Sequence, residues 1–232
     1  MCSWQLVLIS IVHSMISPMF AQAQAGLSAE ARLAKHAEVF RHQALPAGSA
    51  RLEDIRPNAQ GVIYHQRTEI AEYMHDFPPL TPEQEIGRLT ARFDAIVMGV
   101  ATQRHSAIDP THTFLYSDWV IKVSKVFKYP TAFQVGSEVT ITRLGGDLTL
   151  DGRRIIDETP LFPDLALGRQ YVFFLKALPD TASFLAVSGA TFDVSGATPF
   201  LVADPHNPTA MRAFGSGPTA ELISAVERSV VR

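Results

Sequence analysis

The amino-acid sequence predicts a mainly β fold (α+β) in which five strands form a Greek-key barrel between an N-terminal and a C-terminal helix. From residue 95 to residue 187, apolar residues alternate with polar ones or run continuously in short segments, as they do in β-strands. Gly, Pro and Asp residues separate these segments and indicate turns. On either side of this region apolar residues recur every three or four positions, which predicts flanking helices.

Composition and charge exclude several classes of protein. Hydrophobic residues make up 47% of the 232-residue chain and charged residues 19%, a balance typical of a folded domain rather than of a disordered chain. The formal net charge is -3, so we expect no broad basic surface and no binding to nucleic acid. Cys2 is the only cysteine, and no disulfide can therefore form within one chain.

The first 23 residues have the pattern of an export signal. A short apolar run covers residues 6–12. Ala21-Gln22-Ala23 and Ala23-Gln24-Ala25 are both small-x-small sequences of the kind that signal peptidase cleaves. The alternative is an uncleaved membrane anchor, but a bilayer span takes roughly 20 mainly apolar residues. We therefore expect a signal peptide at residues 1–23, a secreted or periplasmic mature protein, and no membrane span after cleavage.

Residues 24–80 are expected to form a helix followed by a polar connector arm. Ser28 can cap a helix that carries Leu33 and Phe40 on one face. Residues 46–79 are polar, contain several Pro and Gly residues and show no sustained period, which is typical of a long connector or a partly ordered arm.

The predicted barrel domain covers residues 81–195 and opens with a short helix. Thr81 can accept a hydrogen bond from a first-turn amide, Pro82 suits the first helical position, and Gln84 can complete a capping box. Residues 196–232 are expected to form a loop and a C-terminal helix capped by Thr219. The predicted strands are residues 95–101, 114–127, 139–141, 171–175 and 184–187, with a hairpin at 148–150 and 153–156 around the turn Asp151-Gly152.

Five strands, the second long and the fourth apolar at every position, suit a barrel of the OB type; the alternative is an open sandwich. Residues 93–97 (FDAIV), 123–128 (VSKVFK) and 167–172 (LGRQYV) resemble the netrin-module and tissue-inhibitor-of-metalloproteinases family, and the layout is similar to that of uncharacterised exported bacterial domains. The resemblance implies an OB-like fold and secretion. Those inhibitors use a ladder of cysteines, which this sequence does not contain. The resemblance therefore does not imply protease inhibition by this chain.

Two histidines and a carboxylate occur close together in the sequence between the first two predicted strands. His105, Asp109 and His112 would supply ligands for a divalent transition metal if a loop brought them together. The alternative is that Asp109 starts a turn before Pro110 and both histidines are solvated.

Three aromatic residues are candidates for a binding surface on the second strand. Phe114 and Tyr116 fall on the polar side of its alternation, and Tyr129 follows its end. Exposed rings on the second and third strands of an OB-type barrel would hold a sugar or a peptide. The alternative is that a bulge exchanges the buried and exposed faces partway along the strand.

The sequence contains no motif for nucleophilic catalysis, such as Gly-x-Ser-x-Gly, Ser-x-x-Lys or His-Glu-x-x-His. We therefore expect an exported, non-enzymatic binding or adaptor module, without a cofactor, for an envelope protein, a peptide or a glycan. The alternative function is a metal-dependent envelope enzyme that uses His105, Asp109 and His112.

Overall fold

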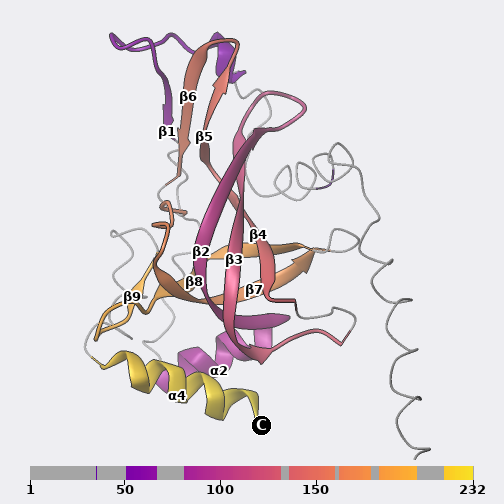
Figure 1. Ribbon diagram of the computed structural model, residues 1–232, viewed down its shortest axis with the longest axis vertical. Helices are drawn as coiled ribbons and strands as arrows, with labels where there is room; N and C mark the ends of the chain where they lie inside the picture. The colour runs from indigo at the N-terminus through magenta and orange to yellow at the C-terminus, as the bar shows by residue number, and fades with distance from the viewer. Residues whose placement is uncertain are drawn as a thin grey trace, which may run out of the picture.

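The computed structural model describes residue 35 and residues 51–66, 81–131, 136–159, 162–178, 183–202 and 217–231 (Figure 1). The fold is mainly β, as the sequence predicts. The predicted export signal and, apart from Lys35, the helix expected from Ser28 lie outside the described residues. The elements are η1 (Leu52–Asp54), β1 (Ile63–Gln66), α2 (Pro82–Arg92), β2 (Ala95–Ile108), β3 (Leu115–Lys128), β4 (Glu138–Leu144), β5 (Gly146–Leu150), β6 (Arg153–Glu158), β7 (Gln170–Leu178), β8 (Ser183–Asp193), β9 (Phe200–Leu201) and α4 (Thr219–Val230).

The larger sheet has the strand order β4-β3-β2-β7-β8-β9, and β4 also pairs with β8. All neighbours in this order are antiparallel, whereas the additional β4–β8 ladder is parallel. Five strands are therefore joined in a closed ring of pairings. β9 lies at residues 200–201, where the sequence predicts only a loop, so that expectation is wrong at these positions.

The hairpin of β2 and β3 is the longest feature of the sheet, with 14 residues in each strand. The sequence predicts a strand at residues 95–101 followed by a loop, but β2 continues to Ile108. The added residues are largely polar, and pairing with β3 holds them in the ladder, as in the pairs of Arg104 with Trp119 and His105 with Asp118. The predicted loop therefore begins only after Ile108.

The predicted hairpin around Asp151-Gly152 is confirmed, with strands β5 and β6 slightly longer than expected. Asp151 has a φ of 49° and Gly152 a φ of 75°. Both turn residues are thus in the left-handed region that a two-residue turn of this kind requires.

A second sheet, with the order β1-β6-β5, lies at the end of the β2–β3 hairpin (Figure 1). Its strand β1 comes from the predicted connector arm and runs parallel to β6. Leu52 and Ile63 are buried here against Leu115 and Ile155. Part of the predicted arm is therefore ordered. Its strand has only a weak signal in the sequence, because only a few apolar residues anchor this segment.

The capping box at the start of α2 is confirmed. The backbone N–H of Gln84 donates to Thr81 Oγ1 over 3.3 Å, and the N–H of Thr81 donates to Gln84 Oε1 over 2.9 Å. The predicted cap of the C-terminal helix is wrong, because the N-cap of α4 is Pro218. Thr219 instead donates its hydroxyl hydrogen to the carbonyl oxygen of Gly196 over 2.7 Å.

Helices α2 and α4 lie side by side against one face of the larger sheet (Figure 1). Their buried residues pack on the side chains of β2, β7 and β8 to form one part of the core. A second part lies among the strands of the ring and includes Trp119 and Phe173. The part of the core on the helix side consists of Ile86, Leu89, Phe93, Ile96, Val172, Phe174, Ala190, Phe192, Val194, Leu201, Leu222 and Val226.

Within the described parts of the chain, no helix combines the length and the apolar character needed to cross a bilayer.

Candidate functional site

Asp109, one of the predicted metal ligands, is the hydrogen-bond acceptor that folds the turn between β2 and β3. Its side chain is 2% exposed. Oδ1 accepts from the backbone N–H groups of Thr113 at 2.6 Å and Phe114 at 2.9 Å, and Oδ2 accepts from the N–H of Thr111 at 2.8 Å. Both carboxylate oxygens are therefore occupied by the turn, as in the alternative that Asp109 starts a turn.

The two predicted histidine ligands lie apart from each other. His105 is in β2, with its Nε2 atom 3.4 Å from Gln103 Oε1, whereas His112 Nδ1 lies 3.0 Å from Glu53 Oε1. Among the described residues, no three His, Cys, Asp or Glu side chains are arranged to hold a metal ion. His105, Asp109 and His112 therefore form no such group in the described part of the chain, because the longer strand and the turn separate residues that are close in sequence.

The predicted aromatic surface is also different in the structure. Phe114 is 1% exposed and Tyr116 is 2% exposed, so neither offers a ring to a ligand, and the expectation that they are exposed is wrong. Tyr129 is half-buried and packs edge-on against Phe184, with ring centroids 5.3 Å apart; burial raises its pKa. The β2–β3 ladder contains register shifts, which fits the alternative that irregular pairing changes the buried face.

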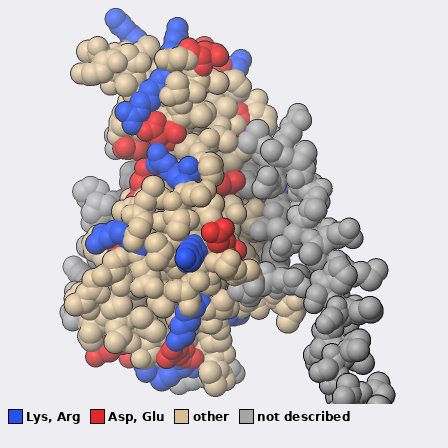
Figure 2. All heavy atoms as spheres, viewed as in Figure 1, with Lys and Arg blue, Asp and Glu red and all other residues tan. Residues whose placement is uncertain are grey.

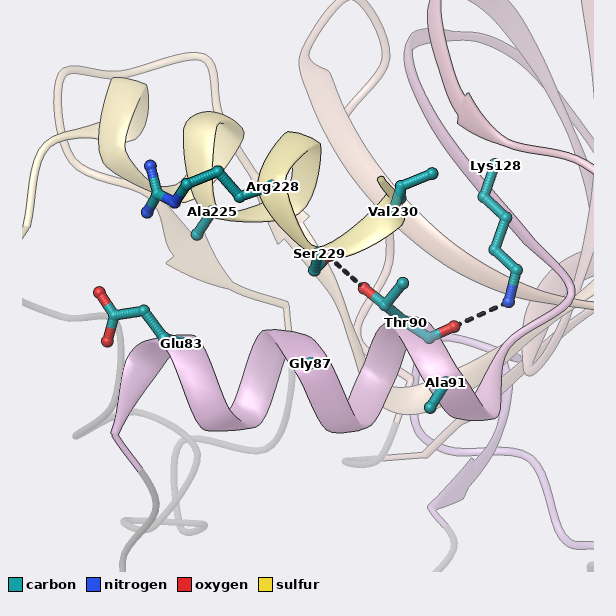
Figure 3. A pocket seen from close by; sticks show the side chains of 9 residues that line it. All are labelled: Glu83, Gly87, Thr90, Ala91, Lys128, Ala225, Arg228, Ser229 and Val230. Carbon is teal, nitrogen blue, oxygen red and sulfur yellow. Dashed lines mark hydrogen bonds between the residues drawn. The ribbon is translucent and has the colours of Figure 1, made fainter. Parts of the chain in front are cut away.

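A groove of about 480 Å³ runs between the outer sides of α2 and α4 (Figure 3). Ile86 and Leu89 of α2 and Leu222 and Val226 of α4 point to the core. The next residues around each helix therefore face the groove, since helical neighbours on one face recur every three or four positions. The lining residues are Glu83, Gly87, Thr90, Ala91, Lys128, Ala225, Arg228, Ser229 and Val230.

The floor of the groove is formed by residues with a methyl side chain or none, namely Gly87, Ala91 and Ala225. Gly87 lies inside α2, where glycine is less favourable than alanine by about 1 kcal/mol. A Cβ atom built on Gly87 meets no atom within 4 Å. No contact within the described chain therefore requires glycine here, and its effect is to leave the backbone of α2 open to a neighbour.

One end of the groove is closed by polar contacts (Figure 3). Thr90 Oγ1 lies 2.7 Å from Ser229 Oγ and links the two helices. Lys128 Nζ donates to the carbonyl oxygens of Thr90 at 2.8 Å and Phe93 at 2.6 Å, at the C-terminal end of α2, where a cation is favourable. Lys128 has no carboxylate at ion-pair distance among the described residues.

The opposite end of the groove carries both a carboxylate and a guanidinium group, from Glu83 of α2 and Arg228 of α4 (Figure 3). Glu83 lies in the first turn of α2, where a negative charge is favourable. Glu83 lies seven positions before Thr90, which corresponds to about 10 Å along a helix. The groove thus combines an apolar middle with Glu83 and Arg228 at one end and the ammonium group of Lys128 at the other.

The sequence predicts both helices but not the groove between them. Thr90 and Ser229 are 139 positions apart, and no local pattern indicates that they meet. The available signal was Gly87, a glycine in the middle of an otherwise well-capped helix. Such a glycine costs stability in a helix, and no packing contact within the described chain explains it.

No protein-family model matches the chain, and no curated protein matches it in sequence. The chemistry and shape of the groove are therefore the basis for assigning a function.

Proposed function

We propose that the chain is an exported, non-enzymatic binding module that holds a segment of another polypeptide in the groove between α2 and α4. The ring of β4, β3, β2, β7 and β8 is proposed to be an OB-like barrel. The antiparallel β2–β7 ladder and the parallel β4–β8 ladder support this, because together they join the first strand to the fourth and the third to the fifth.

The observation that carries the proposal is the open space at Gly87. A helix of this length gains stability from alanine at an unconstrained central position. Glycine instead leaves room for a chain that passes close to the backbone of α2. A groove between two helices with an apolar floor is also a recurring way to bind an apolar peptide face.

The same geometry favours a polypeptide over a glycan. Recognition of a sugar commonly uses an exposed aromatic ring, and Phe114 and Tyr116 are buried. The groove is lined by small or aliphatic residues and two hydroxyl-bearing residues, with Glu83, Arg228 and Lys128 at its ends and no aromatic side chain. Acidic and basic side chains are interspersed over the face shown in Figure 2, so a single-sign charged partner is not favoured.

Photo-crosslinking in the expressing cell tests this function. A photoreactive residue at Ala91, in the groove, should give a specific polypeptide crosslink, and the same residue at Tyr64 in β1 should not. Gly87→Leu should abolish the Ala91 crosslink by filling the groove, and Gly87→Ala should weaken it, because the methyl group takes space beside the backbone of α2. Equal crosslinking from Ala91 and Tyr64, or a crosslink unaffected by Gly87→Leu, would contradict the proposed function.

A further inference from the structure

We infer that residues 51–66 form a strap that opens as a unit while the rest of the fold stays intact, and that the strap thereby controls access to the edge of β6. The strap comprises η1, β1 and the turn between them. It lies at the far end of the β2–β3 hairpin from α2 and α4 (Figure 1), so the inference concerns a different surface from the groove.

Few apolar side chains anchor the strap. Among its described side chains only Leu52 and Ile63 are buried, and they pack on Leu115 of β3 and Ile155 of β6. Ile55 is half-buried against the same cluster. Segments with few buried apolar contacts open at a smaller cost in free energy than the core of a protein does. The strap is therefore the part of the described β structure that we expect to open first.

The backbone of the strap is attached by a short ladder. β1, the edge strand of its sheet, pairs in parallel with β6 over the four residues Ile63–Gln66. One further backbone hydrogen bond runs from the N–H of Leu52 to the carbonyl oxygen of His112 over 2.7 Å. Opening therefore breaks one edge ladder of four residues and leaves every ladder of the larger sheet unchanged.

Two of the side-chain contacts that hold the strap lie at the surface. The hydroxyl group of Tyr64 donates to the carboxylate of Glu158, and Tyr64 is 44% exposed. Glu53 Oε1 lies 3.0 Å from His112 Nδ1, with the two side chains 31% and 32% exposed. Water can replace such contacts, and pairs of this exposure contribute little to stability. These contacts align the closed strap but do little to prevent its opening.

The buried carboxylate beneath the strap keeps a partner when the strap opens. His65 Nδ1 lies 2.8 Å from Asp157 Oδ1, and the side chain of His65 is 30% exposed whereas that of Asp157 is fully buried. The other oxygen of Asp157, Oδ2, accepts from the backbone N–H of Leu115 over 2.7 Å. That bond belongs to β3 and not to the strap. Opening therefore replaces His65 by water and leaves Asp157 bound to Leu115, so no buried charge is stranded.

The elements beneath the strap are held by contacts of their own. Asp109 closes the β2–β3 turn by accepting from the N–H groups of Thr113 and Phe114. β6 remains paired with β5 along its other edge. Opening thus bares one edge of β6 while the turn and the β5–β6 hairpin persist. A bared strand edge has unpaired N–H and C=O groups, to which another extended chain can add, and the closed strap blocks that addition.

Thiol labelling of the full chain carrying Cys2→Ser measures the opening. Ile155→Cys places a thiol beneath the strap, and Ile96→Cys, the matched control, places one in the core on the helix side; the two isoleucines are 1% and 0% exposed. We expect Ile155→Cys to react with a small thiol reagent at least about tenfold faster than Ile96→Cys. Low urea should barely change the faster rate, because local opening exposes little surface. Urea denaturation of both variants gives the rate expected from global unfolding alone.

Two changes at Ile63 should move the strap in opposite directions. Ile63→Ala removes an apolar anchor and should raise the labelling rate of Ile155→Cys at least about tenfold, while that of Ile96→Cys stays unchanged. Ile63→Cys combined with Ile155→Cys joins direct partners of the parallel ladder in a disulfide. That disulfide should slow hydrogen exchange of residues 51–66, and a reducing agent should restore the faster exchange.

Hydrogen exchange of the unmodified chain tests the inference without any substitution. The amides of residues 51–66 should exchange together, and faster than those of residues 95–101 in β2 and 171–175 in β7. Equal protection of the strap and of these strands would overturn the inference, as would labelling of Ile155→Cys no faster than global unfolding allows. Separate exchange of η1 and β1 would also overturn it, because the strap would then not open as a unit.

Discussion

Thr90 Oγ1 donates a hydrogen bond to Ser229 Oγ, and this contact joins α2 to α4 at one end of the groove. The two oxygens are 2.7 Å apart. Ser229 Oγ donates its own hydrogen to the carbonyl oxygen of Val226 over 2.8 Å, so it acts as the acceptor toward Thr90. The width of the groove is thereby tied to one pair of hydroxyl groups.

Loss of that contact should loosen the helix pair. We expect Thr90→Val to lower the free energy of unfolding by about 1 kcal/mol, because the substitution keeps the side-chain volume but removes the hydroxyl donor. Ser229→Ala should have a similar effect, and the double variant should cost less than the sum of the two. Urea denaturation measures these values, with Ser224→Ala in α4 as the control. Full additivity would contradict a direct bond.

Replacing glycine by alanine should have opposite effects at two positions. Gly87→Ala should raise the free energy of unfolding by up to about 1 kcal/mol. Alanine is more favourable than glycine inside a helix, and its Cβ atom displaces no neighbouring atom. Gly152→Ala should lower it by about 1 to 2 kcal/mol, because its φ of 75° is unfavourable for a residue with a Cβ. Thermal and urea unfolding of the two variants check the signs. Effects of the same sign would contradict these assignments.

Arg143 should make the free energy of unfolding depend on pH in alkaline solution. Burial lowers its pKa to about 10, below the value of the unfolded chain, so the folded state loses this proton first. The contribution of Arg143 to the free energy of unfolding therefore rises with pH above about 10. Relative to Arg143→Met, the unmodified chain should gain about 1 kcal/mol between pH 9 and pH 11. A pH-independent difference between the two proteins would contradict a lowered pKa.

Asp109 should contribute to stability through the turn and not through a metal. Asp109→Ala leaves the buried N–H of Phe114 and the N–H of Thr113 without their acceptor, so we expect a loss of about 2 to 3 kcal/mol in the free energy of unfolding. Asp109→Asn, which keeps one acceptor oxygen, should lose less. Added Zn²⁺ should leave the melting temperature of the unmodified chain unchanged. Stabilisation by Zn²⁺ that Asp109→Asn removes would contradict this account.

The export prediction concerns residues 1–23 and has a direct measurement. We expect N-terminal sequencing of the protein recovered from the envelope or the medium to begin at Gln24, after cleavage behind Ala23. A chain lacking residues 2–23 should remain in the cytoplasm. Recovery of the exported protein with residues 1–23 still attached would contradict a cleaved signal.

The sequence alone predicts elements whose cause is local. The Thr81 and Gln84 capping box depends on residues three positions apart, and the Asp151-Gly152 turn depends on two neighbours, so both were predictable. Alternation and apolar runs likewise located the strands, because the side chains of a strand must divide between two faces. The mainly β class follows from these local patterns.

Three features depend on the tertiary structure alone. They are the length of β2, the burial of the aromatic residues Phe114 and Tyr116, and the formation of the groove between α2 and α4. The polar end of β2 is a strand because β3 supplies its hydrogen-bond partners, and Phe114 is buried because distant strands cover it. The meeting of Thr90 with Ser229 requires the whole sheet to bring two ends of the chain together. Such contacts depend on which surfaces pack across the core, and no local spacing of residues encodes that choice.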